Sequence, residues 1–407
     1  MELGLGSNSV LSLADGIGIA LACNPSVMLA RQELAAASSQ VYQATSAYKP
    51  SVSANAAYSR RTSNSGAADA ANDSSDSYSA SIGLDVLLYD FGRTPANVRQ
   101  SVLRRLAAEQ NLRGTQNDVV FAVRSSFFDL AKAQELLQVA TEAVRQAKAH
   151  LDEAKAFTEV GLRTRYDVTK AEVDYGNAQL SLTDAGNTIV STRTALNLAL
   201  GLAEEPGYKI GQVDLMDVQG TPAELMAKAR QLHPGLMVLR TQELVATAQV
   251  DLSIADLFPS ISLGAAYSLS GSAFPLAWNW SATLQSALDI FTGARKTASI
   301  DVAVASLRSA RAALAAREQQ VHLDLARALS TRDAARQRLQ LSELIVRQAT
   351  ESLELITERY KQGKASSIEV TDAQTALTGA RANSVKARFD QQTANASIMH
   401  ITGDAIQ

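Results

Sequence analysis

Four segments of the chain alternate apolar and polar residues one by one, at residues 51–60, 78–89, 260–270 and 278–290. In the first of them Val52, Ala54 and Tyr58 alternate with serine and asparagine. Successive side chains of a β-strand point to opposite faces, so each segment is predicted to be a strand with one apolar and one polar face. Residues 62–77 are rich in Ser, Ala, Asn and Asp, and they are predicted to form the loop between the first two strands.

Most of the remaining sequence has the spacing of amphipathic helices. Helical patterns cover residues 12–47, 95–200 and 294–401. The helix that starts near Ala294 is the most regular, because Ile300, Val304 and Leu307 are spaced like the seam of a coiled coil. Helical stretches of this length predict long packed rods rather than a compact globular core.

Each of the two longest helical stretches is interrupted once by a turn that begins with glycine. Residues 161–170 read GLRTRYDVTK and residues 363–372 read GKASSIEVTD. In both segments a glycine ends one helix, and an acidic residue followed by Val-Thr lies at the start of the next. The sequence therefore predicts two long helical hairpins with tight ends.

The order of elements occurs twice along the chain. Asn24-Pro25 corresponds to His233-Pro234 at an offset of 209 residues, and Gly161 corresponds to Gly363 at an offset of about 201. This self-similarity predicts an internal duplication. Its first repeat is residues 1–220, with a connector at 201–221, and its second is residues 221–407.

Composition excludes several classes of function. A formal net charge of -3 and a pI near 5.9 give no basic footprint for nucleic acid. The four histidines have no partners at metal-ligand spacing, so we predict no metal, no cofactor and no enzymatic activity. Cys23 is the single cysteine, which excludes an intramolecular disulfide. We interpret Cys23 as a small residue within a helix. The alternative is a lipidation signal, because Cys23 follows Ala20-Leu21-Ala22.

No run of apolar residues is long enough for a membrane-spanning helix, but the four strands are long enough to cross a bilayer in a tilted barrel. Residues 1–10 lack the basic and apolar regions of a signal peptide, which predicts the mature form of an exported protein. Aromatic residues lie near the strand ends, as in a membrane-interface belt or as caps of a soluble sheet. They are Tyr58, Tyr78, Tyr89, Tyr267, Trp278 and Trp280.

Four strands do not close a barrel, and lipid does not tolerate an open sheet edge. The barrel must then be shared between chains. Two chains would give eight strands and a filled interior, whereas three would give twelve strands and room for a water-filled lumen. If the function is passage, the sequence favours a homotrimer in contact with outer-membrane lipid.

Several motifs, in this order and spacing, are similar to those of one family. They are Leu13-Ala14-Asp15, Asn24-Pro25, the Pro-Ser-Val and Pro-Ser-Ile strand starts, Asp90-Phe91-Gly92-Arg93, Val160-Gly161-Leu162 and Asp167-Val168. The chain resembles the TolC family of outer-membrane efflux and secretion ducts over nearly its whole length. The resemblance implies a mainly α fold with a membrane β-barrel: a long antiparallel α-helical barrel in the periplasm, a twelve-stranded β-barrel shared by a trimer, and an equatorial region.

The resemblance also implies partners and a function. It implies a passive duct in the bacterial outer membrane that extends into the periplasm, serving a tripartite efflux pump or type I secretion system. A periplasmic adaptor (membrane fusion protein) and an inner-membrane transporter of the ABC or RND type would be its partners. The alternative from another class is a soluble coiled-coil scaffold with a small β cap. The sequence specifies neither the cargo nor the transporter.

Glu369 and Asp372 are three residues apart and share one face of a helix. In a trimer they would form rings of carboxylates that favour cations, and the resemblance implies an acidic gate at these positions. The alternative is a first-turn pair that stabilises the helix N-terminus.

The resemblance places Tyr360 and Asp167 among the residues that lock this gate. Ala365 stands where well-known members of the family have an arginine, and Arg163 and Arg165 are the candidates to replace it; the alternative for both is exposure to solvent. The hairpin ends are expected to be the surface on which the adaptor docks, although their glycines also suit simple helix caps. The expected docking residues are Gly161, Leu162, Arg163, Gly363, Lys364 and Ala365.

Overall fold

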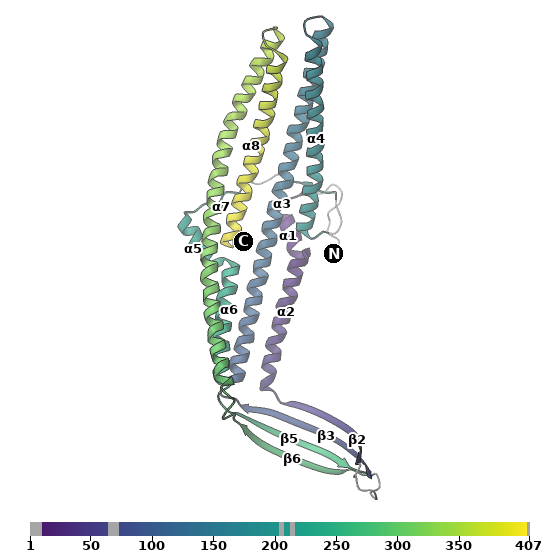
Figure 1. Ribbon diagram of the computed structural model, residues 1–407, viewed down its shortest axis with the longest axis vertical. Coiled ribbons are helices and arrows are strands. Elements are labelled where there is room, and N and C mark those ends of the chain that lie inside the picture. Colours follow the sequence, from purple (N-terminus) through teal and green to yellow (C-terminus); the bar gives the residue numbers. More distant parts are fainter. Residues whose placement is uncertain (1–9, 64–72, 203–206, 212–215, 405–407) are drawn as a thin grey trace. The chain divides into compact units, whose positions relative to one another are not determined.

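The computed structural model describes residues 10–63, 73–202, 207–211 and 216–404 (Figure 1). They form two compact units, and the chain passes back and forth between them. The first unit comprises residues 1–31, 111–236 and 317–407, and the second comprises residues 32–110 and 237–316. The predicted absence of a signal peptide concerns residues that lie almost entirely outside the described part of the chain.

Helices dominate the first unit. Four lie in it completely: α1 (Leu13–Cys23), α4 (Arg165–Leu200), α5 (Pro222–Leu232) and α8 (Ser367–Thr402). The long helices α3 (Arg93–Glu159) and α7 (Arg295–Lys361) contribute residues to both units, as do α2 (Pro25–Thr45) and α6 (Pro234–Ala255). A short strand in the expected connector, β4 (Lys209–Ile210), pairs in parallel with β1 (Val10–Leu11).

The predicted helix at residues 12–47 is two helices in the structure. The break is at Asn24, whose side-chain oxygen accepts a hydrogen bond from the backbone N–H of Ser26 at 2.9 Å. Pro25 then begins α2, a position where its missing N–H costs nothing. The 3₁₀ turn η1 (Ser46–Tyr48) follows α2.

In the first unit α7, α8, α3 and α4 form a wall in this order (Figure 1). An apolar cluster around Leu325 joins α7 to α8. The Asn117 side chain donates to the backbone carbonyl of His400 at 2.9 Å, which joins α3 to α8. A cluster around Ala154 joins α3 to α4. The outer helices of the wall are therefore α4 and α7.

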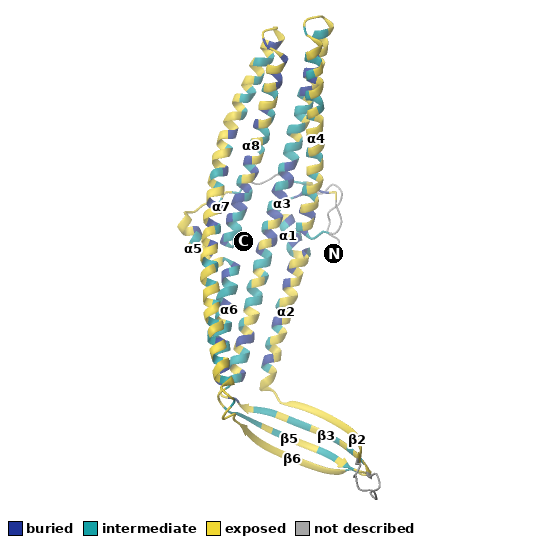
Figure 2. Ribbon diagram, in the orientation of Figure 1, coloured by how far each residue is buried: buried dark blue, intermediate teal, exposed yellow. Residues whose placement is uncertain are grey.

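The main core of the first unit lies where α1, α3, α4 and α8 meet. Phe127, Phe128, Leu196 and Leu200 are completely buried there. Buried residues follow the faces that the helices turn toward one another, while exposed residues cover the opposite faces (Figure 2). Gly201 ends α4 with a φ of 76°, and its position against α1 leaves no room for a side chain.

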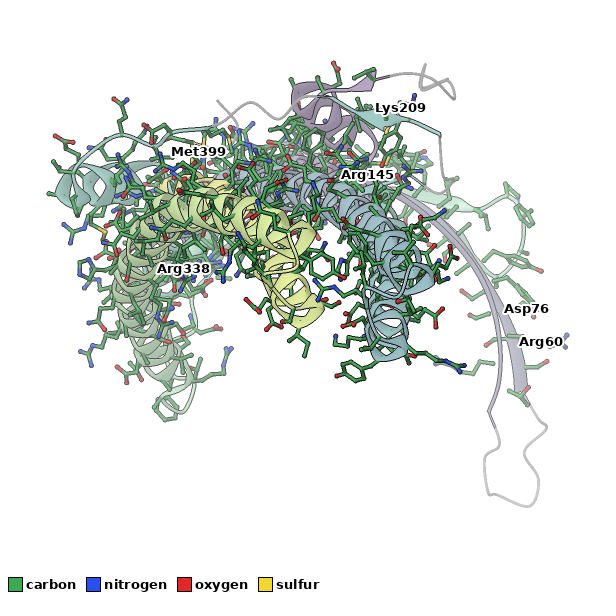
Figure 3. All side chains as sticks on the ribbon, turned by 90° about the horizontal axis from the view of Figure 1, so that it is seen from above. Arg60, Asp76, Arg145, Lys209, Arg338 and Met399 are labelled. Carbon is green, nitrogen blue, oxygen red and sulfur yellow. The ribbon has the colours of Figure 1, made fainter. Side chains whose placement is uncertain are left out.

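The second unit contains a four-stranded antiparallel sheet. Its strands are β2 (Ser51–Ser63), β3 (Asp73–Tyr89), β5 (Ser260–Gly271) and β6 (Ala277–Ala287), in the order β2-β3-β5-β6. The predicted loop at 62–77 is too long, because β2 and β3 extend into it; a ladder of backbone hydrogen bonds does not require apolar side chains. Arg60 and Asp76, labelled in Figure 3, form an ion pair of 3.8 Å across this extension. The fourth strand ends earlier than predicted, at Ala287 rather than near residue 290.

The register of the sheet sorts its side chains onto two faces. Ala54, Ile82, Tyr267 and Trp280 pair in turn across all four strands, so the apolar positions share one face. The opposite face carries the next row: Asn55, Ser81, Ser268 and Asn279. An irregularity between Leu87 and Tyr89 interrupts the predicted alternation at the end of β3.

Among the described residues, no single helix combines the length and apolar character of a membrane span. One pair bent by 46°, Leu13–Cys23 with Pro25–Tyr48, meets that test of length and composition.

Candidate functional site

The hairpin ends of the first unit have the same backbone geometry. Gly161 and Gly363 have φ values of +77° and +74°, in the left-handed region that glycine enters at little cost. The N–H of Leu162 donates to the carbonyl of Phe157 at 2.9 Å, and the corresponding bond of Lys364 is 2.8 Å long. Both turns are Schellman motifs, which stop one helix and reverse the chain.

A capping box starts the second helix of each hairpin. Glu369 accepts from the backbone N–H of Ser366 at 3.0 Å, and its own N–H donates to the Ser366 hydroxyl. Asp167 caps α4 in the same way through Thr164 at 3.1 Å. These bonds, with the Ser366 N–H as the largest contribution, lower the pKa of Glu369. Both acids therefore stabilise helix N-termini, whatever else they do.

Arg163 connects the two hairpins. Its Nη2 donates to the backbone carbonyls of Tyr360 at 3.2 Å and Ala365 at 3.0 Å. Its guanidinium also lies 4.4 Å from the centre of the Tyr360 ring. Arg163 thus supplies, from the opposite hairpin, a cationic link next to Ala365. Among the described contacts, Arg165 makes no corresponding link.

Tyr360 is the centre of a buried cluster at the hairpin ends. It packs with Ala365 and Val370, and Phe157 from the other hairpin lies 6.0 Å from its ring centre. Burial raises the pKa of Tyr360, and the positive charge of Arg163 is the largest effect that opposes it. No described residue forms a hydrogen bond of normal geometry with the Tyr360 hydroxyl. The two residues assigned to the lock, Tyr360 and Asp167, are therefore not hydrogen-bonded to each other.

Two further bonds hold the first turn of α8 against the other hairpin. The Ser367 hydroxyl lies 3.0 Å from Nε2 of His150 on α3, in a buried contact. The Thr371 hydroxyl donates to Asp174 on α4 at 3.1 Å, and Asp174 also pairs with Lys170 at 2.6 Å. We call the contacts of Arg163, His150 and Asp174 with the other hairpin the tip latch.

Glu369 and Asp372 lie outside this latch. Both are exposed, and with Leu355 and Arg359 they line a groove of about 540 Å³ between α7 and α8. The structure thus places the two proposed gate acids together on one exposed face, immediately after the turn that the tip latch holds.

The expected docking residues differ in exposure. Leu162 is 70% exposed, whereas Ala365 is only 7% exposed and belongs to the buried cluster. Gly161, Gly363 and Lys364 are exposed at the turns. Five of the six expected residues therefore offer at least part of their surface, since Arg163 is partly buried beneath its link to the other hairpin.

The expected interface aromatics lie on the sheet of the second unit. Tyr58 and Tyr78 pair across β2 and β3 with ring centres 5.0 Å apart, and Tyr267 pairs with Trp280. Trp278 and Trp280 are both 66% exposed. At the opposite end of β3, Tyr89 contacts Phe91 at 4.7 Å, which gives the sheet two separate aromatic levels.

The sequence pattern does not indicate His150, Asp174, Ser367 or Thr371 as site residues. Their partners lie about 200 residues away along the chain, so no local pattern connects them. His150 has no metal-ligand spacing, so its position in the sequence does not point to a site. In the described part of the chain, no group of three or more His, Cys, Asp or Glu side chains could hold a metal ion.

A wall of long helical hairpins joined in one chain to a four-stranded sheet with an apolar face defines the class of outer-membrane channels. Solved structures of this class have the same fold. The chain matches the Campylobacter jejuni CmeC outer membrane channel with a TM-score of 0.85 and 16% identity, over 97% of this chain and 86% of that one. A membrane protein from Pseudomonas aeruginosa matches with a TM-score of 0.85 and 21% identity, over 96% and 93%. The expected fold class is confirmed.

The outer membrane efflux protein family matches residues 16–202 and 225–404. The chain belongs to this family. It is similar to the outer membrane efflux protein BepC of Brucella suis biovar 1, with 24% identity over 371 residues that cover 88% of this chain and 78% of that protein. It is also similar to the cation efflux system protein CusC of Escherichia coli K12, with 23% identity over 323 residues, or 77% of this chain and 70% of that protein.

Proposed function

We propose that the protein is a passive trimeric duct of the bacterial outer membrane, through which a tripartite pump or type I secretion system exports its cargo. The observation that carries this proposal is the open sheet of the second unit. Among the described residues, the outer strands β2 and β6 have no further partner strand, and one face of the sheet is apolar across all four strands. Such a sheet is stable in lipid only when other copies complete a closed barrel.

The two aromatic levels fit the thickness of a membrane. Tyr78 and Tyr89 lie eleven residues apart on β3, which corresponds to about 36 Å along a strand. A strand tilted by about 45° then separates the levels by roughly 25 Å, the height of the apolar band of an outer-membrane barrel. Tyr58, Trp278 and Trp280 would lie at the first level and Tyr89 at the second.

The outer helices of the wall support a ring of three chains. On α4, Tyr166, Val173 and Leu180 follow one another by seven residues, and each is more than half exposed. On α7, Leu341 and Leu355 are about 60% exposed. An apolar stripe at each edge of the wall fits a head-to-tail interface between α4 of one chain and α7 of the next. Such an interface closes into a ring of three when it relates successive chains by a third of a turn.

The proposed gate is at the hairpin ends. In a ring of three chains, Glu369 and Asp372 of each chain would meet at the axis and narrow the entrance with six carboxylates. Converging carboxylates favour cations and resist anions. The capping box of Glu369 is compatible with this role, because capping uses one carboxylate oxygen and leaves the side chain exposed.

The proposed partners are a periplasmic adaptor, which would dock on the exposed residues of the hairpin ends, and an inner-membrane ABC or RND transporter. Leu162 is the most suitable anchor, since an apolar side chain with 70% exposure at a turn has little role in the fold. We expect Leu162→Glu to abolish export in cells without changing the conductance of the purified duct. A loss of both would indicate damage to the duct itself.

The experiment that tests the function uses the two tryptophans of the chain, Trp278 and Trp280, as probes. The protein is reconstituted into vesicles that contain lipids brominated on the acyl chains. A membrane duct predicts strong quenching of tryptophan fluorescence, a heat-resistant trimer and discrete conductance steps in planar bilayers. A coiled-coil scaffold with a β cap predicts no quenching and extraction without detergent, and that result would overturn the proposal.

A further inference from the structure

His150 occupies an unusual position for a titratable residue. It is on α3, only 4% of its surface is exposed, and its ring faces the hairpin that carries the gate acids. Nε2 lies 3.0 Å from the hydroxyl of Ser367, the first residue of α8, which is itself 1% exposed. The centre of the ring lies 5.4 Å from that of Tyr360. One histidine thus contacts both helices of the opposite hairpin.

A neutral imidazole suits this site and a charged one does not. Burial lowers the pKa of His150, and it outweighs the nearby carboxylates that act in the opposite direction. The contacts from α7 and α8 are a phenol ring and a hydroxyl, neither of which carries a negative charge. The charged and titratable groups around the ring are Glu153 on α3, Asp167, Lys170 and Asp174 on α4, Tyr360 on α7, and Arg163 in the turn.

We propose that the arrangement of the hairpin ends in this structure is the closed gate and that His150 is a positioning residue of it: while neutral it holds the first turn of α8 and the acids after it in place, and its protonation releases them. This inference rests on the proposed function of the hairpin ends as a gate. It adds that the gate opens on acidification of the periplasm, through one buried side chain.

The direction follows from linkage. In the open gate the ring would be hydrated and its pKa close to the ordinary value of about 6.5. The closed gate therefore binds fewer protons than the open gate. The stabilisation of the closed gate by neutral His150 is complete well above pH 6.5, and it decreases as the pH falls toward the lowered pKa of the closed state. Once the pH is below the pKa of His150 in both states, each pH unit of difference between these two pKa values lowers the closed-to-open ratio about tenfold.

Glu369 is the other titratable residue of this turn. Its capping bonds lower its pKa and favour the ionised form, whereas carboxylates that converge in a trimer would raise it. His150→Gln keeps Glu369 and Asp372 in place, so this variant separates the effect of His150 from any titration of the gate acids.

The experiment measures the open probability of the full-length trimer in planar bilayers at pH 7.5 and 5.5. The open probability of the wild type should be at least about threefold higher at pH 5.5 than at pH 7.5, because His150 binds a proton more readily in the open gate than in the closed one. His150→Gln, whose amide can still bond Ser367, should stay closed at both values. Ser367→Ala should be more open than the wild type at pH 7.5, with a smaller further increase on acidification.

Thr371→Val is the matched control, because it removes the neighbouring bond to Asp174 and leaves His150 in place. It should be more open at both pH values and keep the acid-dependent step. A step of wild-type size in His150→Gln, or no step in the wild type, would overturn the proposal. If either of these two contradicting results came from ducts whose ion selectivity still depended on Glu369 and Asp372, the proposed function would stand and only the role of His150 would be overturned. Failure to form any conducting trimer would overturn the proposed function.

A second measurement does not require conductance. Hydrogen exchange of the backbone amides of residues 363–372, corrected for the intrinsic effect of pH, should increase at pH 5.5 in the wild-type trimer and not in His150→Gln. Equal protection at both pH values in the wild type would contradict a release of the first turn of α8.

Discussion

The Arg163 guanidinium donates to the backbone carbonyl of Ala365 at 3.0 Å, across the two hairpins. An arginine side chain at position 365 would be the simpler way to place a cation at this junction, but the chain has alanine there. The positive charge comes from the α3–α4 turn instead and also covers the Tyr360 ring. Because its acceptors are main-chain carbonyls, this link depends on the conformation of the turn around Ala365 rather than on a particular side chain.

Replacing Arg163 should weaken the closed state of the proposed gate. Arg163→Ala removes both hydrogen bonds and the contact with Tyr360, at a cost of about 1 kcal/mol for a partly exposed link, or roughly fivefold in the closed-to-open ratio. Arg163→Lys should have a smaller effect, because its ammonium can still donate to a backbone carbonyl, but some effect should remain because it cannot reproduce the flat stacked contact. Single-channel open probability checks both. Arg165→Ala is the control, and equal effects of Arg163→Ala and Arg165→Ala would contradict a specific link.

The charge of the proposed gate acids, Glu369 and Asp372, can be removed without changing their shape. We expect the double variant Glu369→Gln, Asp372→Asn to lower the cation-to-anion permeability ratio severalfold, because six carboxylates of the trimer become neutral. Glutamine also suits the third position of a capping box, so α8 should keep its start. Reversal potentials in a salt gradient give the ratio. Glu172→Gln, which alters an exposed pair with Lys155, should leave it unchanged, and an unchanged ratio in the double variant would remove the gate assignment.

The features that the sequence predicted well are encoded by neighbouring residues. The turn at Gly161 needs a left-handed residue at one position, and the strand around Tyr58 shows its two faces within a few residues. The strand extensions near Arg60 and Asp76 were missed because serine-rich sequence resembles a loop when its pairing partner is unknown.

The tip latch could not be predicted in the same way. His150 and Ser367 are 217 residues apart, and Arg163 and Ala365 are 202 apart. Each pair forms only after two hairpins have packed side by side. Composition at Arg163 indicated a positive charge near the turn, but only the folded chain shows whether that charge faces solvent or the opposite hairpin.

The head-to-tail interface predicts which residues of neighbouring chains meet. Leu180 lies fifteen residues after the start of α4, and Ile345 lies sixteen residues before the end of α7. Both are then about 23 Å from the hairpin ends. In a Cys23→Ala background, the pair Leu180→Cys and Ile345→Cys should form disulfide-linked trimers on mild oxidation, visible on a denaturing gel without reductant.

Ser330 provides the matched control for this cross-link. It is exposed on α7, but it lies thirty-one residues before the end of that helix, about 23 Å farther from the hairpin end than Ile345. Leu180→Cys with Ser330→Cys should therefore remain monomeric on the same gel. Equal cross-linking of both pairs would contradict the proposed register of α4 against α7.

Four glycines with similar left-handed backbone should respond differently to alanine. A Cβ at Gly201 would lie 2.7 Å from the backbone of Asn24, and at Gly403 it would lie 2.6 Å from the carbonyl oxygen of Leu232. A Cβ at Gly161 or Gly363 would meet nothing within 4 Å. Alanine at the hairpin ends should cost only the backbone strain, about 1 kcal/mol.

At Gly201 and Gly403, alanine must also displace main-chain atoms, which adds roughly 1–3 kcal/mol. The temperature at which the trimer dissociates should therefore fall clearly for Gly201→Ala and Gly403→Ala, and little for Gly161→Ala and Gly363→Ala. Because the four variants make the same substitution at positive φ, strain alone would lower all four temperatures equally. Equal shifts would thus show that the close approach of α4 to Asn24, and of α8 to Leu232, relaxes without cost.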